Sequence, residues 1–394
     1  MEVSHGTDKH YRITFQCLKA LPARCYVGRS IGESRMSKPQ NKPTGSTHAD
    51  SVKASIVVPC YKVEKYLPRC LDSLVGQTLE DIEVICINDG SPDRCIDILR
   101  DYEARYPGKV VVIDKPNEGV WKGRRDAIAI ARGEYIGFVD SDDYVAPDFA
   151  ESLYRAAKEA EADISVCGFH RVDVDTGDIL TTEMAERREP IDVRACPERL
   201  LELNGAPWNK FFAARLMKEL PDLPNPPRIF DDMMMHLLAF PRVDKVVFVD
   251  KPLVFYLIRP DSIMTTIDKS KIESTYQSML DVREVYERLG VLDRLGEFLD
   301  AAAFLHLGIS LMFRVSYDKS ADLKGVLAEN TAYLDARFPT WRASKVVSSA
   351  NAKRFGGVFG RLNWAKRIYK LHLMGPALAC YRFAIAKLHI DIKW

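Results

Sequence analysis

Acidic side chains stand where buried strands are expected to end. Asp140, Asp142 and Asp143 directly follow the apolar run 135–139. Asp89 follows another such run. Carboxylates this close repel one another unless a positive group lies among them, and Mg²⁺ or Mn²⁺ needs only one or two when substrate phosphates supply the other oxygens. The pattern therefore indicates a divalent-cation site, with a solvated acidic turn as the alternative.

A second group of residues has the chemistry to contact a diphosphate. Asn117 and Gly119 lie in the loop after the apolar run 110–113, and Arg124 and Arg125 follow a few positions later. Backbone N–H and guanidinium groups are donors that bind phosphate oxygens in proteins. The alternative is that these arginines are simply solvated on an exposed helix face.

These candidates depend on a sheet that brings the strand ends together. From Ser55 onward, short β-branched runs alternate with amphipathic stretches, which predicts parallel strands joined by crossover helices. In such a sheet, ligands bind beyond the carboxyl ends of the strands. The expected strands are 55–58, 84–87, 110–113, 135–139 and 164–167. After Arg171 the pattern becomes mainly helical, apart from a hairpin-like stretch at 173–182 and a strand at 245–249, with long helices expected at 269–289 and 292–317.

The order of these segments resembles glycosyltransferase family 2, whose members have the GT-A fold. The segments that carry the resemblance are Ser55 to Leu67, Cys70 to Leu74, Asn88-Asp89-Gly90-Ser91 and Phe138-Val139-Asp140-Ser141-Asp142-Asp143. The resemblance is dense from about Ser55 to Ala160 and sparser to about Thr265. It implies an α/β, Rossmann-like GT-A fold with a mostly parallel sheet and flanking helices, followed by a mainly α-helical C-terminal region.

The same resemblance implies a role for each candidate residue. Asp232 is the catalytic base, while Asp140 and Asp142 bind the metal. The residues implied to bind the nucleotide sugar are Pro59, Tyr61, Glu64, Asp89, Asn117, Gly119, Arg124 and Asp140. The residues implied to contact the acceptor or the diphosphate are Trp208, Asn209, Lys210, Asp231 and Arg259. The alternative for the two acidic residues at 231 and 232 is that they only stabilise a helix start.

The implied reaction is an inverting sugar transfer by a metal-dependent, hexosyltransferase-type enzyme. The donor is a nucleotide-diphosphate sugar, with a UDP-sugar expected, and the acceptor is a glycan or a lipid-linked glycan. A nucleotidyltransferase normally needs a Gly-rich, Lys-containing loop after the first strand, and Pro59-Cys60-Tyr61-Lys62 is not one. A non-catalytic GT-A-fold binding or scaffold protein remains the rival, because Trp121 and Arg125 stand where the family usually has other residues.

Composition narrows the partners and the compartment. Lys and Arg number 56 and Asp and Glu 55 in 394 residues, so no global field points to nucleic acid. The nine cysteines show no C-x-x-C pairing, which favours reduced thiols and a cytoplasmic location. No continuous apolar stretch reaches the length of a membrane span and no secretory signal is evident, so the chain is predicted to be neither exported nor membrane-spanning.

The chain is expected to divide into four segments. Residues 1–52 are a flexible basic leader, with Met36 as a hypothetical start, and 53–265 form the GT-A domain with a donor half (53–171) and an acceptor half (172–265). A helical region covers 266–340, and 341–394 form a basic, aromatic tail.

The predicted tail is strongly basic. From Lys353 to Trp394 there are nine Lys and Arg residues and one acidic residue, Asp391. This composition predicts peripheral attachment to the anionic inner face of the cell membrane, and the alternative is plain packing with solvated basic faces.

Overall fold

The computed structural model describes residues 52–259, 269–318 and 320–388. All of these belong to one compact unit, His48–Trp394. Except for Val52, the predicted leader lies outside the described residues, as does the hypothetical start at Met36.

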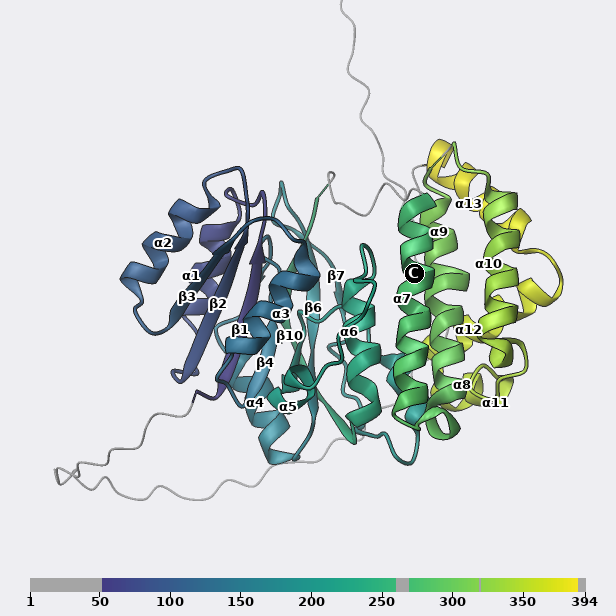
Figure 1. Cartoon of the computed structure of the whole chain (residues 1–394), viewed down its shortest axis with the longest axis horizontal. Helices are drawn as coiled ribbons and strands as arrows, with labels where there is room; N and C mark the ends of the chain where they lie inside the picture. Colours follow the sequence, from purple (N-terminus) through teal and green to yellow (C-terminus); the bar gives the residue numbers. More distant parts are fainter. Residues whose placement is uncertain (1–51, 260–268, 319, 389–394) are drawn as a thin grey trace, which may run out of the picture. The chain divides into compact units, whose positions relative to one another are not determined.

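One mixed sheet forms the centre of the first half of the chain (Figure 1), with the strand order β3-β2-β1-β4-β9-β6-β10-β5. β7 and β8 pair with β6 and β10 off this path. The strands are β1 (Ala54–Cys60), β2 (Ile82–Asp89), β3 (Val110–Lys115), β4 (Tyr135–Phe138), β5 (Tyr144–Val145), β6 (Ile164–Asp173), β7 (Ile179–Glu183), β8 (Ile191–Asp192), β9 (Lys210–Ala213) and β10 (Lys245–Ile258).

The four strands from β3 to β4 run parallel, as the alternation of runs and helices predicts. β9 then enters antiparallel between β4 and β6, and this insertion makes the sheet mixed. The register pairs Cys60 with Asn88 and Asp89 with Lys115, so neighbouring strands end at the same edge. We call this the carboxyl edge of the sheet.

Successive side chains of a strand point to opposite faces of the sheet, and β1, β2 and β4 are buried on both faces. On β1, Ile56 and Val58 join the core beneath α1, α2 and α4, whereas Val57 joins a second core on the other face. On β2, Val84 and Ile85 divide in the same way. The helices of this half are α1 (Leu67–Val75), α2 (Cys95–Arg105), α3 (Val120–Ile130), α4 (Phe149–Glu159), α5 (Ala214–Lys218) and α6 (Asp231–Ala239).

The C-terminal region is helical (Figure 1), which agrees with the prediction. The buried apolar side chains of these helices belong to the same continuous core as those on the α3 side of the sheet. Tyr286 on α7 donates from its hydroxyl to the carbonyl oxygen of Leu237 on α6 at 2.8 Å. The helices are α7 (Lys269–Arg288), α8 (Leu292–Ala303), the π-helical η4 (Phe304–Leu311), α9 (Met312–Val315), α10 (Leu323–Arg337), α11 (Ser349–Phe355), α12 (Gly357–Lys370) and α13 (Met374–Leu388).

One helix in the described residues, Leu292–Val315, is long and apolar enough to cross a membrane by length and composition. It comprises α8, η4 and α9. The inside of the protein buries 72% of its apolar window. Core packing therefore accounts for this composition, and the helix is weak evidence for a span.

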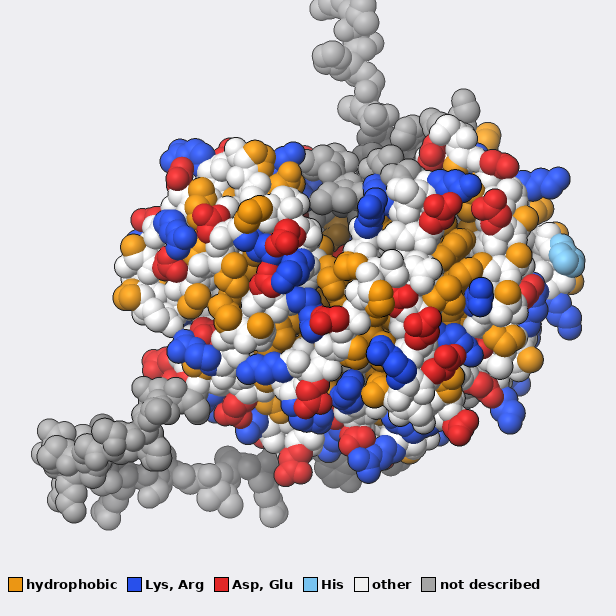
Figure 2. Space-filling view, viewed as in Figure 1, with side chains coloured by type: hydrophobic (Ala, Val, Ile, Leu, Met, Phe, Trp, Pro, Cys, Tyr) orange, Lys and Arg blue, Asp and Glu red, His pale blue; other side chains and the backbone are white. Residues whose placement is uncertain are grey.

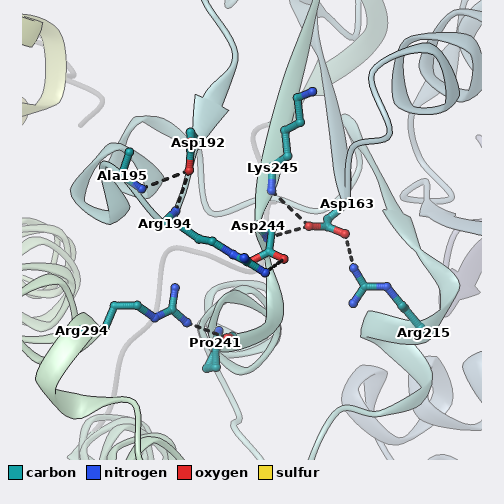
Figure 3. A network of polar contacts seen from close by, with 9 residues as sticks. All are labelled: Asp163, Asp192, Arg194, Ala195, Arg215, Pro241, Asp244, Lys245 and Arg294. Carbon is teal, nitrogen blue, oxygen red and sulfur yellow. Dashed lines mark hydrogen bonds and ion pairs between the residues drawn. The ribbon is translucent and has the colours of Figure 1, made fainter.

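A network of hydrogen bonds and ion pairs lies where β6 and β10 begin, at the edge of the sheet opposite the carboxyl edge (Figure 3). Asp163, just before β6, accepts from the backbone N–H groups of Asp244 at 2.6 Å and Lys245 at 3.1 Å, and it pairs with Arg215 of α5. Arg294 of α8 donates to the carbonyl oxygen of Pro241 at 2.9 Å. These bonds fix where β6 and β10 begin.

Candidate active site

Asp89, the last residue of β2, hydrogen-bonds to the loop that precedes α3. Asp89, which is buried, accepts from the backbone N–H of Glu118 at 2.9 Å with one oxygen and from that of Gly119 at 2.8 Å with the other. Gly90 has a φ of 62°, and a Cβ there would lie 2.6 Å from the backbone nitrogen of Asn117. The structure therefore brings Asp89, Asn117 and Gly119 together, with the Asp89 carboxylate holding the loop.

Arg124 faces inward from α3 and joins carboxylates from two distant segments. One guanidinium nitrogen, Nη1, lies 2.5 Å from both Asp231 Oδ2 and Asp232 Oδ1, at the start of α6. The other, Nη2, lies 3.6 Å from Asp140 Oδ1, just after β4. Burial opposes the charge on Arg124, but the charges of Asp232, Asp231 and Asp140 outweigh it and raise the pKa of the guanidinium.

A second arginine meets the acidic turn after β4. Arg259 Nη2 lies 2.7 Å from Asp142 Oδ2, and its guanidinium lies 5.3 Å from the ring centroid of Tyr66. Asp143 is almost fully buried and accepts from the backbone N–H of Leu257 at 2.8 Å. Burial raises the pKa of Asp143 well above its usual range, and the charge of Asp142 adds to the effect. Asp143 thus ties the acidic turn to β10.

The donor set at this edge fits a divalent cation. Burial and the charge of Asp232 raise the pKa of Asp140 above its ordinary value, because together they outweigh the opposing effect of Arg124. Within the described residues, no group of three or more His, Cys, Asp or Glu side chains could hold a metal ion. The carboxylates of Asp140 and Asp142 remain partly exposed, and two carboxylates suffice for Mg²⁺ or Mn²⁺ when substrate phosphates supply the rest.

Three predicted nucleotide contacts lie at or just beyond the end of β1. Pro59 is on the strand, opposite β2, and Tyr61 follows it with its side chain 42% exposed. Glu64 is exposed and accepts from the backbone N–H of Arg94 at 2.8 Å. The Tyr61 ring is thus accessible from solvent, whereas the Glu64 carboxylate joins this turn to the start of α2.

The segment from Trp208 to Lys210, predicted to lie on the acceptor side, is buried. The Trp208 ring stacks on Tyr256 with centroids 5.3 Å apart. Asn209 donates to the carbonyl oxygen of Cys167 at 2.7 Å. Lys210 donates to Ala206 O at 2.6 Å and Asn209 Oδ1 at 2.8 Å, and burial lowers the pKa of its ammonium group to about 7. These bonds anchor the loop before β9.

Two features at the start of α6 did not emerge from the sequence. His236, one turn after Asp232, contacts the Asp232 carbonyl oxygen through Nδ1 at 2.6 Å, and burial lowers the pKa of the imidazole well below its usual value. The i, i+4 spacing on α6 was the available signal. Phe230, just before the helix, has a φ of 58°, which is strained for a bulky residue. Such strain is often found at functional sites.

Comparison with known proteins gives a consistent result. A family model described as Glycosyl transferase family 2 matches residues 55–223. The chain is 35% identical over 218 residues to the uncharacterized glycosyltransferase EpsJ of Bacillus subtilis (strain 168), covering 53% of this chain and 62% of EpsJ, which is less than two thirds of that relative. It is 31% identical over 264 residues to the putative glycosyltransferase EpsH of the same organism, covering 66% of this chain and 76% of EpsH.

A solved structure shares the fold. The crystal structure of residues 1–349 of S. aureus TarS in complex with UDP-GlcNAc matches with a TM-score of 0.60 and 19% sequence identity. The match covers 81% of this chain and 92% of that one. The predicted fold class, a GT-A-type α/β sheet followed by a helical region, is confirmed.

Proposed function

Because this chain belongs to glycosyl transferase family 2, we propose that it is a hexosyltransferase-type enzyme that transfers a sugar from a nucleotide-diphosphate sugar to an acceptor hydroxyl group. The observation that carries the proposal is the meeting of Arg124 with Asp140 on one side and with Asp231 and Asp232 on the other. These segments are far apart in sequence, and they converge at the edge where ligands of open α/β sheets bind.

Asp232 accepts the proton of the acceptor hydroxyl. As this proton leaves, the hydroxyl oxygen bonds to the anomeric carbon from the face opposite the diphosphate, and the bond from that carbon to the diphosphate oxygen breaks. The single displacement inverts the anomeric configuration. Arg124 holds Asp232 and Asp231 in place, so that the base is oriented before the acceptor arrives.

Asp140 and Asp142 are the residues that hold the divalent cation. When bound, Mg²⁺ or Mn²⁺ supplies positive charge that stabilises the departing diphosphate. Arg259, 2.7 Å from Asp142, is placed to contribute a second positive charge on the same side. Asn117, Gly119 and Arg124 form the protein side of the diphosphate site.

The nucleoside half of the donor lies beyond β1 and β2. The half-exposed Tyr61 ring is available to stack on a base, and Pro59 and Glu64 border the same space. Asp89 shapes this pocket by holding the loop at Gly119. A UDP-sugar is the proposed donor, in line with the UDP-GlcNAc complex of the similarly folded TarS.

The acceptor is a growing glycan or a lipid-linked glycan of a cell-surface polysaccharide. Trp208, Asn209, Lys210, Asp231 and Arg259 belong to the proposed acceptor and diphosphate side. The proposed division has the GT-A domain at 53–265, helices at 266–340 and a basic tail at 341–394. The proposed location is cytoplasmic, at the inner face of the cell membrane.

The test is release of free nucleoside diphosphate from a panel of nucleotide sugars, with an acceptor glycan extract and with Mg²⁺, Mn²⁺ or a chelator. We expect turnover of one donor that the chelator abolishes. The Asp142→Ala variant should lower turnover by about 100-fold or more, since it removes a ligand that acts on the leaving group. Asp148→Ala is the matched control, because Asp148, just before α4, pairs with Lys251 of β10 in a solvent-exposed ion pair.

Metal-independent turnover would contradict the role of Asp140 and Asp142. The rival reading, a non-catalytic GT-A-fold protein, predicts donor binding by calorimetry with no turnover of any sugar by the wild type.

A further inference from the structure

Exposed apolar side chains gather on the last two helices. Trp364 on α12 is 54% exposed and Phe383 on α13 is 61% exposed, while Leu371 and Leu373 in the turn between these helices are 64% and 48% exposed. The other large exposed apolar residues are scattered, with Val120 and Ile130 at opposite ends of α3 and Ile179 on β7. The C-terminal group is therefore a patch, and a patch of this kind marks an interaction site.

The same two helices are held firmly by their opposite faces. Tyr369 on α12 is buried, donates to the carbonyl oxygen of Gly308 and packs edge-on against Trp341. On α13, Leu378 is fully buried, and Arg382 donates to backbone carbonyl oxygens that include Asp318 O at 2.8 Å. The patch is thus the outer face of a packed helix pair.

The helical period places the exposed residues in one stripe. Along α12, Arg361, Trp364 and Arg367 are spaced by three residues and all are exposed, and Leu371 follows four positions later. On α13, Pro376, Ala379, Cys380 and Phe383 share the outward face. We call these eight residues, together with Lys370 and Leu373, the α12–α13 surface.

Along the sequence of these last helices the charge has one sign. From Ala336 to Ile390 the sequence contains eleven Lys and Arg residues and no Asp or Glu. Arg361, Arg367 and Lys370 are exposed beside the apolar side chains. In Figure 2, Lys and Arg side chains stand along the right-hand margin of this view, with Asp and Glu side chains beside them. A helix with an apolar stripe, a cationic rim and an interfacial Trp suits the boundary between lipid headgroups and acyl chains.

We propose that the α12–α13 surface docks on an anionic lipid bilayer, with Trp364, Leu371 and Phe383 entering the interface and the basic rim contacting lipid phosphates. The long Arg and Lys side chains can keep their charges at the headgroups while their stems cover apolar atoms. This inference rests on the proposed transferase for its purpose, which is to keep the enzyme beside a membrane-bound acceptor.

Flotation of the full chain with vesicles tests the docking. We expect the protein to float with vesicles of equal parts phosphatidylcholine and phosphatidylglycerol and to remain below with phosphatidylcholine alone. The triple variant Arg361→Gln, Arg367→Gln, Lys370→Gln should bind about 100-fold more weakly, since each of the three basic residues near an anionic surface contributes roughly fivefold. The triple variant Trp364→Ser, Leu371→Ser, Phe383→Ser should also stop floating.

The control is Ile130→Ser combined with Ile179→Ser, which removes exposed apolar side chains from α3 and β7 and should float like the wild type. All replaced side chains are exposed, and an unchanged unfolding temperature checks that each variant is folded. Absence of wild-type flotation on anionic vesicles, or equal flotation of the wild type and both triple variants, would overturn the inference.

A fluorophore on Cys380 reports directly on contact with lipid. Cys380 is exposed on the outward face of α13, and replacing Cys17, Cys25 and Cys196 with Ser leaves it as the accessible thiol, because the other five cysteines are buried. An environment-sensitive label should shift to the blue on anionic vesicles, and an unshifted spectrum contradicts docking through this face. Donor turnover is measured without vesicles, so failure of docking and failure of the transferase proposal are distinguishable.

Discussion

Arg124 is the residue whose removal the structure predicts to be most costly. Its side chain is 5% exposed, and its guanidinium group lies within ion-pair distance of three carboxylates. Arg124→Met keeps much of the volume but leaves the carboxylates of Asp231, Asp232 and Asp140 without their shared cation. Breaking a buried ion pair by removing one partner costs about 3–5 kcal/mol. That is a large fraction of a typical unfolding free energy of roughly 5–15 kcal/mol.

The next residue along α3 provides a matched control. Arg125 pairs with Asp222, whose side chain is 88% exposed, at 2.8 Å. An exposed pair of this kind contributes at most about 1 kcal/mol. Urea denaturation followed by circular dichroism should therefore give Arg124→Met a much lower midpoint than Arg125→Met, with Arg124→Lys in between because an ammonium group cannot reproduce the guanidinium fork.

Donor turnover adds a second measure of the same variants. The Arg124→Met variant should lose turnover even under conditions where it remains folded, whereas Arg125→Met should retain it. Equal denaturation midpoints for the two methionine variants would refute the reasoning, because the buried ion pairs of Arg124 would then stabilise the fold no more than the exposed pair of Arg125.

Two further predictions concern the loop before α3 and the partly buried imidazole of His306. Asp89→Ala removes the acceptor of two backbone N–H groups and should raise the KM for the donor about tenfold or more, with a smaller effect on kcat. An unchanged KM would show that the loop keeps its conformation without the Asp89 carboxylate. Burial lowers the pKa of His306 to about 4, so the unfolded chain binds more protons between that pKa and about 6.5, and stability falls as the pH falls through this window. When the pH is lowered from about 7 to about 5, the unfolding free energy of His306→Leu should fall by on the order of 1 to 2 kcal/mol less than that of the wild type. The exposed-site control His372→Leu should lose as much as the wild type.

The parallel half of the fold could be predicted from the sequence because its signals are local. The apolar runs 55–58 and 84–87 lie within β1 and β2, and the ends of these two strands lie at one edge, where Cys60 pairs with Asn88. The position of β9 could not be foreseen. Its four residues pair antiparallel with β4 and β6, and that choice depends on contacts across more than forty positions.

The site shows the same division between local and long-range information. The place of Asp140 and Asp142 at this edge could be predicted from their position after a strand, and their role as metal ligands stays a prediction. The contact of Arg124 with Asp231 and Asp232 spans more than a hundred positions, so it depends on the tertiary fold that brings the start of α6 to Arg124. Lys210 is predicted from resemblance to contact the acceptor side, yet in the structure its ammonium group bonds to oxygens of its own loop. Its role in transfer stays a prediction.

The central claim is that Asp232 takes the proton of the acceptor in an inverting transfer. The direct measurement compares Asp232→Asn with the wild type in two assays: sugar transfer to the acceptor, and calorimetric binding of the donor. The account predicts that transfer falls by at least about 100-fold, as for loss of a general base, while donor affinity changes little. Transfer at the wild-type rate by the Asp232→Asn variant, or retention of the anomeric configuration in the first-formed product, would contradict it.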